Sequence, residues 1–237
     1  MKKLFPILQP AITIVFLILA CIIYGLSLVP SILLFNHIYI SINTPSLFLK
    51  AFYLGCTISL GFFMFGISLI LIVGCVFRVL PIKPKPGIYP LSSLDTLKWG
   101  LCGAFLRLVY LTFLNFITPS FLNIFYFRLV GAKIGKNVQL NTININDPWL
   151  LEIGDNSIIG GGSSVNCHTV EGGNLILEKV KIGKKCTIGA QSLIWPGCTI
   201  GDRSILATKS VLKKRTQVGE KEIWKGNPAE NIRIRKS

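Results

Sequence analysis

The sequence predicts an N-terminal transmembrane α-hairpin followed by a C-terminal all-β domain, a parallel β-helix. Two observations support this prediction. Long segments without charged residues occupy the first third of the chain. Near the C-terminus an aliphatic residue recurs every six positions, a period that is typical of parallel β-helices.

The uncharged segments are residues 4–49 and 51–77, which contain no Asp, Glu, Lys or Arg. A helix needs about 20 apolar residues to cross the hydrocarbon layer of a bilayer, so we expect two spans near residues 11–35 and 51–77. Buried core helices are the alternative, but uncharged runs of this length exceed ordinary core helices. Residues 1–78 therefore form a predicted two-span hairpin.

The residues that flank the two spans predict their orientation. The loop between the spans carries only Lys50, whereas the outer flanks carry Lys2, Lys3, Arg78, Lys83 and Lys85. By the positive-inside rule, both termini and the β-helix lie on the cytoplasmic side. We expect a multi-pass protein of the bacterial inner membrane. A cleaved secretory signal is the alternative for the N-terminus, but the apolar run continues well past Cys21.

Residues 79–130 form a predicted connecting region. Residues 80–90 hold four prolines and a glycine and are expected to be an extended linker. Residues 108–127 carry no charge, but Pro119 interrupts them. A third span would fit by length, yet it would move the β-helix across the membrane. We therefore expect two shorter amphipathic helices in the membrane interface.

The six-residue period defines a predicted domain at residues 131–237. The aliphatic positions are Ile182, Ile188, Ile194, Ile200, Leu206 and Leu212, with the same phase upstream at Ile134, Leu140, Ile153, Ile159 and Val165. The second residue of each repeat is usually small, and so is the fifth. Three repeats make one triangular coil, in which the aliphatic residue fills the interior. We expect the glycine after it to permit the turn at the corner.

The period breaks twice. Leu140 and Ile153 are thirteen residues apart where twelve would keep phase, which predicts a bulge over residues 146–149. Val165 and Ile182 are seventeen apart where eighteen would keep phase, which predicts a corner that leaves the regular wall within residues 168–181. Such departures from a regular scaffold are where binding chemistry tends to lie.

The segment Ile182–Thr216 resembles the left-handed β-helix of the hexapeptide-repeat acyltransferases. Gly226, Asn227 and Pro228 belong to a stretch similar to the one that closes the helix in many acetyltransferases of that superfamily. The resemblance implies a homotrimer, an acyl-CoA (acetyl-CoA) donor bound between neighbouring prisms, and a histidine as general base. It implies no metal. The stretch from His168 to Glu171 is also similar to a His-x-x-Glu stretch in the terminal domains of polylysine-type synthetases.

Three residues at the second break are the candidate catalytic group. His168 is the only histidine in the predicted β-helix, and acyl transfer from a thioester needs a base that titrates near neutral pH. Glu171 is expected to hold the imidazole tautomer, as the carboxylate does in a catalytic triad. Asn166 is expected to orient an acceptor or bind an oxyanion. A surface imidazole and a corner asparagine are the corresponding structural alternatives.

A basic cluster is the candidate cofactor site, because lysine and arginine pair with the phosphates of coenzyme A. A solvated face or attraction to anionic lipid is the alternative. Trp195 stands where the repeat expects a small residue, so it is expected to project into a groove or an interface. The predicted cofactor-binding set is Trp195, Lys209, Lys213, Lys214, Arg215, Gly226, Asn227 and Pro228. We expect membrane lipids as partners of this basic chain, whose net charge is +15, and the resemblance adds acyl-CoA. We expect no nucleic acid.

The predicted function is a membrane-anchored acyltransferase that moves an acetyl group from coenzyme A to a hydroxyl or amine of an envelope-related or small-molecule acceptor. One alternative is an amine-condensing enzyme with a thioester-held aminoacyl donor, and another is a non-catalytic trimeric membrane scaffold. A single histidine in the domain excludes the three-histidine zinc site of the carbonic anhydrases. Nucleotide hydrolysis and serine hydrolase chemistry find no supporting motif.

Overall fold

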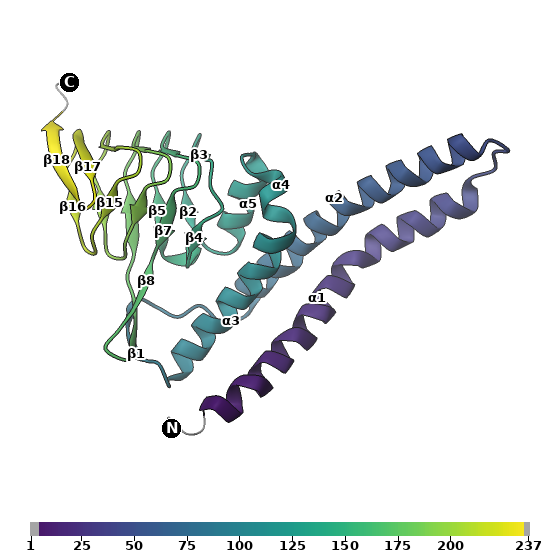
Figure 1. Ribbon diagram of the computed structural model, residues 1–237, viewed down its shortest axis with the longest axis horizontal. Helices are drawn as coiled ribbons and strands as arrows, with labels where there is room; N and C mark the ends of the chain where they lie inside the picture. Colours follow the sequence, from purple (N-terminus) through teal and green to yellow (C-terminus); the bar gives the residue numbers. More distant parts are fainter. Residues whose placement is uncertain (1–4, 235–237) are drawn as a thin grey trace. The chain divides into compact units, whose positions relative to one another are not determined.

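The computed structural model describes residues 5–234, so Lys2 and Lys3 of the orientation prediction lie outside the described residues (Figure 1). The chain divides into two compact units. One contains Met1–Val76 and Ala104–Phe113, and the other contains Phe77–Gly103 and Leu114–Ser237. The predicted connecting region, residues 79–130, is therefore divided between both units.

The predicted hairpin consists of two long helices, α1 (Phe5–Ser41) and α2 (Leu47–Val79). The segments Pro10–Ser41 and Leu47–Val79 are long and apolar enough to cross a membrane. The Ser31 hydroxyl of α1 donates to the carbonyl of Gly61 of α2 at 2.6 Å. This hydrogen bond joins the two helices and pairs the serine hydroxyl. The helices expected near residues 11–35 and 51–77 are thus present.

A third apolar helix is longer than the sequence led us to expect. Helix α3 (Leu94–Val109), a π-helical turn (Tyr110–Leu114) and α4 (Asn115–Ile117) follow one another without a break. The resulting helix, Leu94–Ile117, is also long and apolar enough to cross a membrane. Proline lacks the backbone N–H that would continue a helix, and the interruption predicted at Pro119 is confirmed. Helix α5 (Phe121–Leu129) follows it, and the hydroxyl of its N-cap Ser120 accepts from the Leu122 N–H.

The β-helix predicted from the six-residue period is confirmed as three walls of parallel strands (Figure 1). Wall one contains β2 (Lys133–Ile134), β5 (Leu151–Ile153), β10 (Val180–Ile182), β13 (Thr199–Ile200) and β16 (Gln217–Val218). Wall two contains β3 (Gln139–Leu140), β6 (Ile158–Ile159), β11 (Thr187–Ile188), β14 (Ile205–Leu206) and β17 (Glu222–Gly226), and antiparallel β18 (Ala229–Ile234) covers its edge. Wall three contains β4 (Ile145–Asn146), β7 (Ser164–Asn166), β12 (Leu193–Ile194) and β15 (Val211–Leu212).

The aliphatic positions stack in register inside the prism. Ile182, for example, pairs with Ile153 on one side and Ile200 on the other, and all three are buried. The small fifth residues satisfy backbone carbonyls of the next coil. The Ser192 hydroxyl donates to the carbonyl of Ala207 at 2.9 Å. These small buried side chains are thereby paired, as a stable interior requires.

The role predicted for the second-position glycines is wrong. A Cβ atom at Gly189 would lie 2.3 Å from the backbone nitrogen of Thr208, and one at Gly201 would lie 2.6 Å from the carbonyl carbon of Gly219. These glycines therefore permit close stacking of coils. The left-handed turn is made by the fourth residue of each repeat, for example Lys185 at φ 55°, a conformation that non-glycine residues adopt only locally.

We expect the substitution Ile188→Asp to prevent folding. Ile188 is fully buried in β11, so an unpaired carboxylate there would cost several kcal/mol. Thr187→Asp is the matched control, because Thr187 is exposed on the same strand. Circular dichroism and thermal melting of the two variants in detergent measure the difference. Equal melting temperatures would contradict the assigned interior.

Candidate active site

The two breaks in the period lie side by side at one corner of the prism. Strands β4 and β7 are neighbours in wall three, with Asn146 paired to Asn166. After β4 the chain takes a left-handed conformation at Asp147 and a short 3-10 turn over Pro148–Leu150. After β7 it leaves the wall as an antiparallel hairpin, β8 (His168–Glu171) and β9 (Asn174–Leu177). We call this hairpin the arm. Both predicted irregularities are confirmed.

His168, at the base of the arm, forms a pair with Asp147. The imidazole Nδ1 lies 2.5 Å from the carboxylate Oδ2. The Asp147 side chain is only 5% exposed, whereas that of His168 is 27% exposed. When the Nδ1–H of a neutral imidazole donates to the Asp147 carboxylate, the Nε2 atom of the same ring holds the free lone pair. This is the arrangement that a general base requires.

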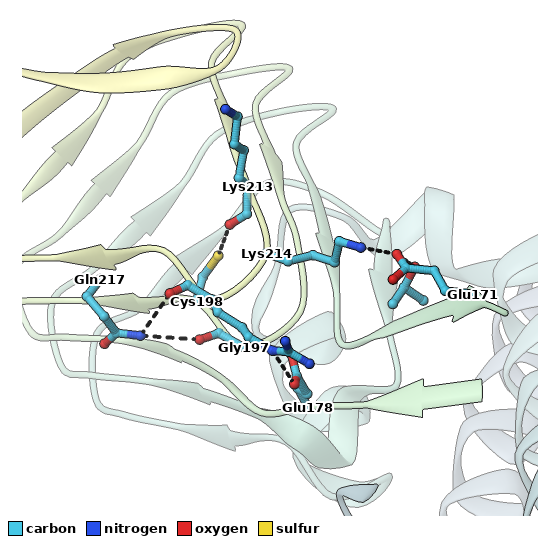
Figure 2. Close-up of polar contacts among 9 residues, drawn as sticks. Glu171, Glu178, Gly197, Cys198, Lys213, Lys214 and Gln217 are labelled. Carbon is cyan, nitrogen blue, oxygen red and sulfur yellow. Dashed lines mark hydrogen bonds and ion pairs between the residues drawn. The ribbon is translucent and has the colours of Figure 1, made fainter. Parts of the chain in front are cut away.

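The partner predicted for the imidazole is wrong, because Asp147 and not Glu171 orients it. His168 and Glu171 are three residues apart on one strand, and side chains alternate between the two faces of a strand. Glu171 therefore points away from the imidazole. Its carboxylate instead forms an ion pair with Lys214 (Figure 2).

The side chain of Trp99, which lies outside the β-helix, contacts both members of the pair. The Trp99 indole N–H donates to Asp147 Oδ1 at 2.8 Å. The indole ring also meets the His168 ring edge-on, with centroids 4.8 Å apart and planes at 65°. Trp99 belongs to α3. Each carboxylate oxygen of Asp147 thus has one partner, and the imidazole is held from two sides.

The remaining site residues follow the wall-three corner from coil to coil. The residues that directly follow the buried aliphatic position on β4, β7, β12 and β15 are Asn146, Asn166, Trp195 and Lys213. The predicted residue Asn166 accepts from the Asn146 amide at 2.5 Å. After wall one the equivalent position is glycine on every coil, for example Gly183 and Gly201. Larger side chains are therefore collected at the one corner that carries His168.

A cavity of about 430 Å³ opens beside the arm. Its lining residues are Thr169, Glu171, Trp195, Lys213 and Lys214. The lining thus combines one aromatic residue with two lysines, and the ammonium group of Lys214 is paired with Glu171 (Figure 2).

The other residues predicted for cofactor binding lie elsewhere. Arg215 forms an ion pair of 2.7 Å with Glu178, at the point where the chain returns from the arm to the wall. Lys209 follows β14, and Gly226 ends β17, the next strand of wall two. The Gly226 N–H donates to the Ser210 hydroxyl at 3.1 Å. Asn227 and Pro228 continue from Gly226 and are exposed, so this group belongs to a different corner.

The buried thiol of Cys167 lies next to His168 in the chain. Its side chain is fully buried. Burial and then the negative charge of Asp147 raise the pKa of this thiol well above its usual range, so the reactive thiolate is disfavoured. Between residues 5 and 234, no group of three or more His, Cys, Asp or Glu side chains could hold a metal ion.

Sequence reasoning missed Asp147 and Trp99. Asp147 had a signal, because it is an acidic residue inside the first break, 21 residues before the histidine of the second. Trp99 had none. It reaches Asp147 across 48 residues of chain, through packing that no local pattern records.

One family model and several known proteins are similar to this chain in sequence. The family model described as "Bacterial transferase hexapeptide (six repeats)" matches residues 179–214. The chain is 30% identical over 136 residues to the "Putative colanic acid biosynthesis acetyltransferase WcaF" of Escherichia coli strain K12, covering 47% of this chain and 74% of that protein. It is 28% identical over 157 residues to the delta-poly-L-ornithine synthetase of Acinetobacter baumannii, covering 66% of this chain. The chain spans only 12% of that synthetase.

Among solved structures, a galactoside acetyltransferase in complex with coenzyme A is similar to this chain. The TM-score is 0.48 at 20% sequence identity, and the match covers 63% of this chain and 86% of that one.

Proposed function

The chain belongs to the bacterial hexapeptide-repeat acetyltransferases, and on that premise we propose that it transfers an acetyl group from acetyl-CoA to a hydroxyl or amine of an acceptor. The observation that carries the proposal is the pair of His168 and Asp147 at the corner where the period breaks. A scaffold protein would need neither a buried carboxylate on an imidazole nor a cavity beside it.

His168 acts as the general base in this proposal. Its Nε2 accepts the proton of the attacking hydroxyl or amine, and the imidazolium then returns that proton to the departing thiolate of coenzyme A. Asp147 holds the productive tautomer and stabilises the imidazolium while the proton is on the ring.

The cavity beside the arm is proposed to hold the coenzyme A end of the donor. The ammonium groups of Lys213 and Lys214 suit phosphate oxygens, and the Trp195 ring offers apolar surface to the uncharged part of the molecule. Thr169, next to the base on β8, lines the same cavity. Thr169 and Glu171 lie on the face of β8 opposite His168, so a donor bound in this cavity would have to extend past the edge of the arm for its thioester to reach the imidazole.

One observation favours a second candidate, an amine-condensing enzyme with a thioester-held aminoacyl donor. The similarity to the polyornithine synthetase covers 66% of this chain, more than the β-helix alone contains. A stretch of that length must include the segment that contains both Trp99 and Asp147. The two candidates differ in their donor. Release of free coenzyme A from acetyl-CoA by the purified protein in the presence of envelope extracts supports the first.

We further propose that the protein is anchored by α1 and α2 and that the third apolar helix does not cross the bilayer. Trp99, near the start of that helix, contacts Asp147, and Asn123, after its end, donates to the carbonyl of Leu140 at 2.8 Å. Asp147 and Leu140 belong to the same first coil. A helix of 24 residues is about 36 Å long, so crossing would place its ends on opposite sides of the membrane. Contacts of both ends with one coil favour an interfacial position.

The mutation His168→Ala should lower kcat by roughly 10²–10⁴-fold, the usual contribution of a positioned base. Asp147→Asn should lower it by roughly 10²-fold or more, because the amide does not hold the productive tautomer. Glu171→Gln is the matched control on the same arm and should cost less than about 10-fold, since Glu171 contacts Lys214 instead of the imidazole. Coenzyme A release measures all three. Wild-type turnover in His168→Ala would place the chemistry elsewhere.

Single cysteines at Lys98 and Lys133 should be labelled from the same side of the membrane. Lys98 lies in the first turns of the third helix and Lys133 lies in β2, beyond its other end, and both side chains are exposed. The background replaces Cys21, Cys56 and Cys75, the exposed native cysteines. In intact spheroplasts an impermeant maleimide should label neither position, and permeabilisation should expose both. Labelling of only one position before permeabilisation would show that the helix spans.

A homotrimer is the proposed assembly, as the family resemblance implies, because a slim prism leaves flat faces exposed. Mass photometry of the protein in mild detergent should give one species at three times the mass of the 26.2 kDa chain, after correction for bound detergent. A monodisperse monomer would contradict this assembly and a cavity completed by a neighbouring prism.

A further inference from the structure

We propose that Trp99 is a positioning residue for the base, so that the start of helix α3 is a working part of the active site. This inference rests on the proposed function. The contact that carries it is the Trp99 indole N–H, which donates to Asp147 Oδ1 at 2.8 Å while Asp147 Oδ2 faces His168 Nδ1 at 2.5 Å. The indole thus acts on the imidazole through the carboxylate.

The geometry gives Trp99 two effects on the base. The donated N–H stabilises the carboxylate as an anion and fixes its rotation about the Cβ–Cγ bond. The edge-on ring, 4.8 Å from the imidazole centroid, blocks one direction in which His168 could swing. A base displaced by about 1 Å can lose roughly 10²-fold in rate, so both effects bear on turnover.

The segment that carries Trp99 is itself fixed to both catalytic loops. Strand β1 (Gly87–Pro90) pairs antiparallel with β9 of the arm, and in this sheet Gly87, Leu177 and His168 are in register across three strands. On the other loop, the Trp149 indole donates to the carbonyl of Pro84 at 3.0 Å. The linker predicted to be merely extended is thus the third strand of the sheet that holds the base.

Trp99 is partly exposed beside a half-buried imidazole, and the carboxylate that it contacts is almost fully buried. A hydrogen bond to a buried charged group is stronger than one between neutral groups. Its loss would leave one oxygen of Asp147 without its indole partner. The expected consequence is a poorly oriented base in a folded protein.

The test is a double-mutant cycle with Trp99→Phe and Asp147→Asn in the full-length trimer. Phenylalanine keeps the ring and removes the N–H. We expect Trp99→Phe to lower kcat by about 10–100-fold with the KM for acetyl-CoA changed less than about 2-fold. In the Asp147→Asn background the same change should cost less than about 3-fold, because the two residues act as one unit. Trp224→Phe is the matched control: it removes an indole N–H donated to a different carboxylate, that of Glu222 at 2.7 Å, and should show no such coupling.

Wild-type kcat in Trp99→Phe, or an equal loss in both backgrounds, would overturn the inference. A measurement independent of turnover uses the indole N–H resonances of the four tryptophans in ¹⁵N-labelled protein. The Trp99 resonance should shift on Asp147→Asn while that of Trp224, whose indole donates to Glu222, stays in place. An unshifted Trp99 resonance would also overturn it. Absence of coenzyme A release by the wild type, with the Trp99 resonance still coupled to Asp147, would instead reject the proposed function.

Discussion

The close stacking of successive coils is the constraint on which the rest of this structure depends. Where the coils meet after wall one, a Cβ atom would lie within 3 Å of the next backbone, so glycine recurs at Gly154, Gly183 and Gly201. The corner after wall three is free of this restriction. It accepts Asn166, Trp195 and Lys213 at the equivalent position. Close stacking therefore restricts the corner after wall one to glycine, whereas the corner after wall three accepts larger polar and aromatic side chains.

At that corner the two breaks in the six-residue period bring Asp147 and His168 into contact. Ile145 and Ile153 are eight residues apart where a regular repeat has six. Within this longer connection Asp147 takes a left-handed conformation and turns its carboxylate toward the neighbouring coil. The arm after β7 begins with His168 and brings it to the same place. The pair of His168 and Asp147 results from two local departures on adjacent coils.

The site also depends on residues outside the repeat. Residues 77–103 belong to the same compact unit as the β-helix, and they contribute a strand to the arm and an indole to Asp147. The helix that starts there is consequently tied to Asp147 near one end and, after its other end, through Asn123 to the first coil.

The sequence alone determined the features that come from local repetition and composition. The apolar helices follow from uncharged runs, the coils from the spacing of residues such as Ile182 and Ile188, and the place of the site from the two breaks in phase. It also singled out His168 and Trp195 by their positions in the repeat. Tertiary structure decided which groups meet.

Because side chains alternate along a strand, Glu171 points away from the imidazole and pairs with Lys214. The stacking of coils brings Asp147 to the imidazole instead. The helix that brings Trp99 to the same carboxylate lies 48 residues earlier in the chain. Periodicity specifies the direction of a side chain relative to its own backbone. Contacts between side chains that are far apart in sequence, such as Trp99 and Asp147, depend on how the elements pack, and no single segment determines that packing.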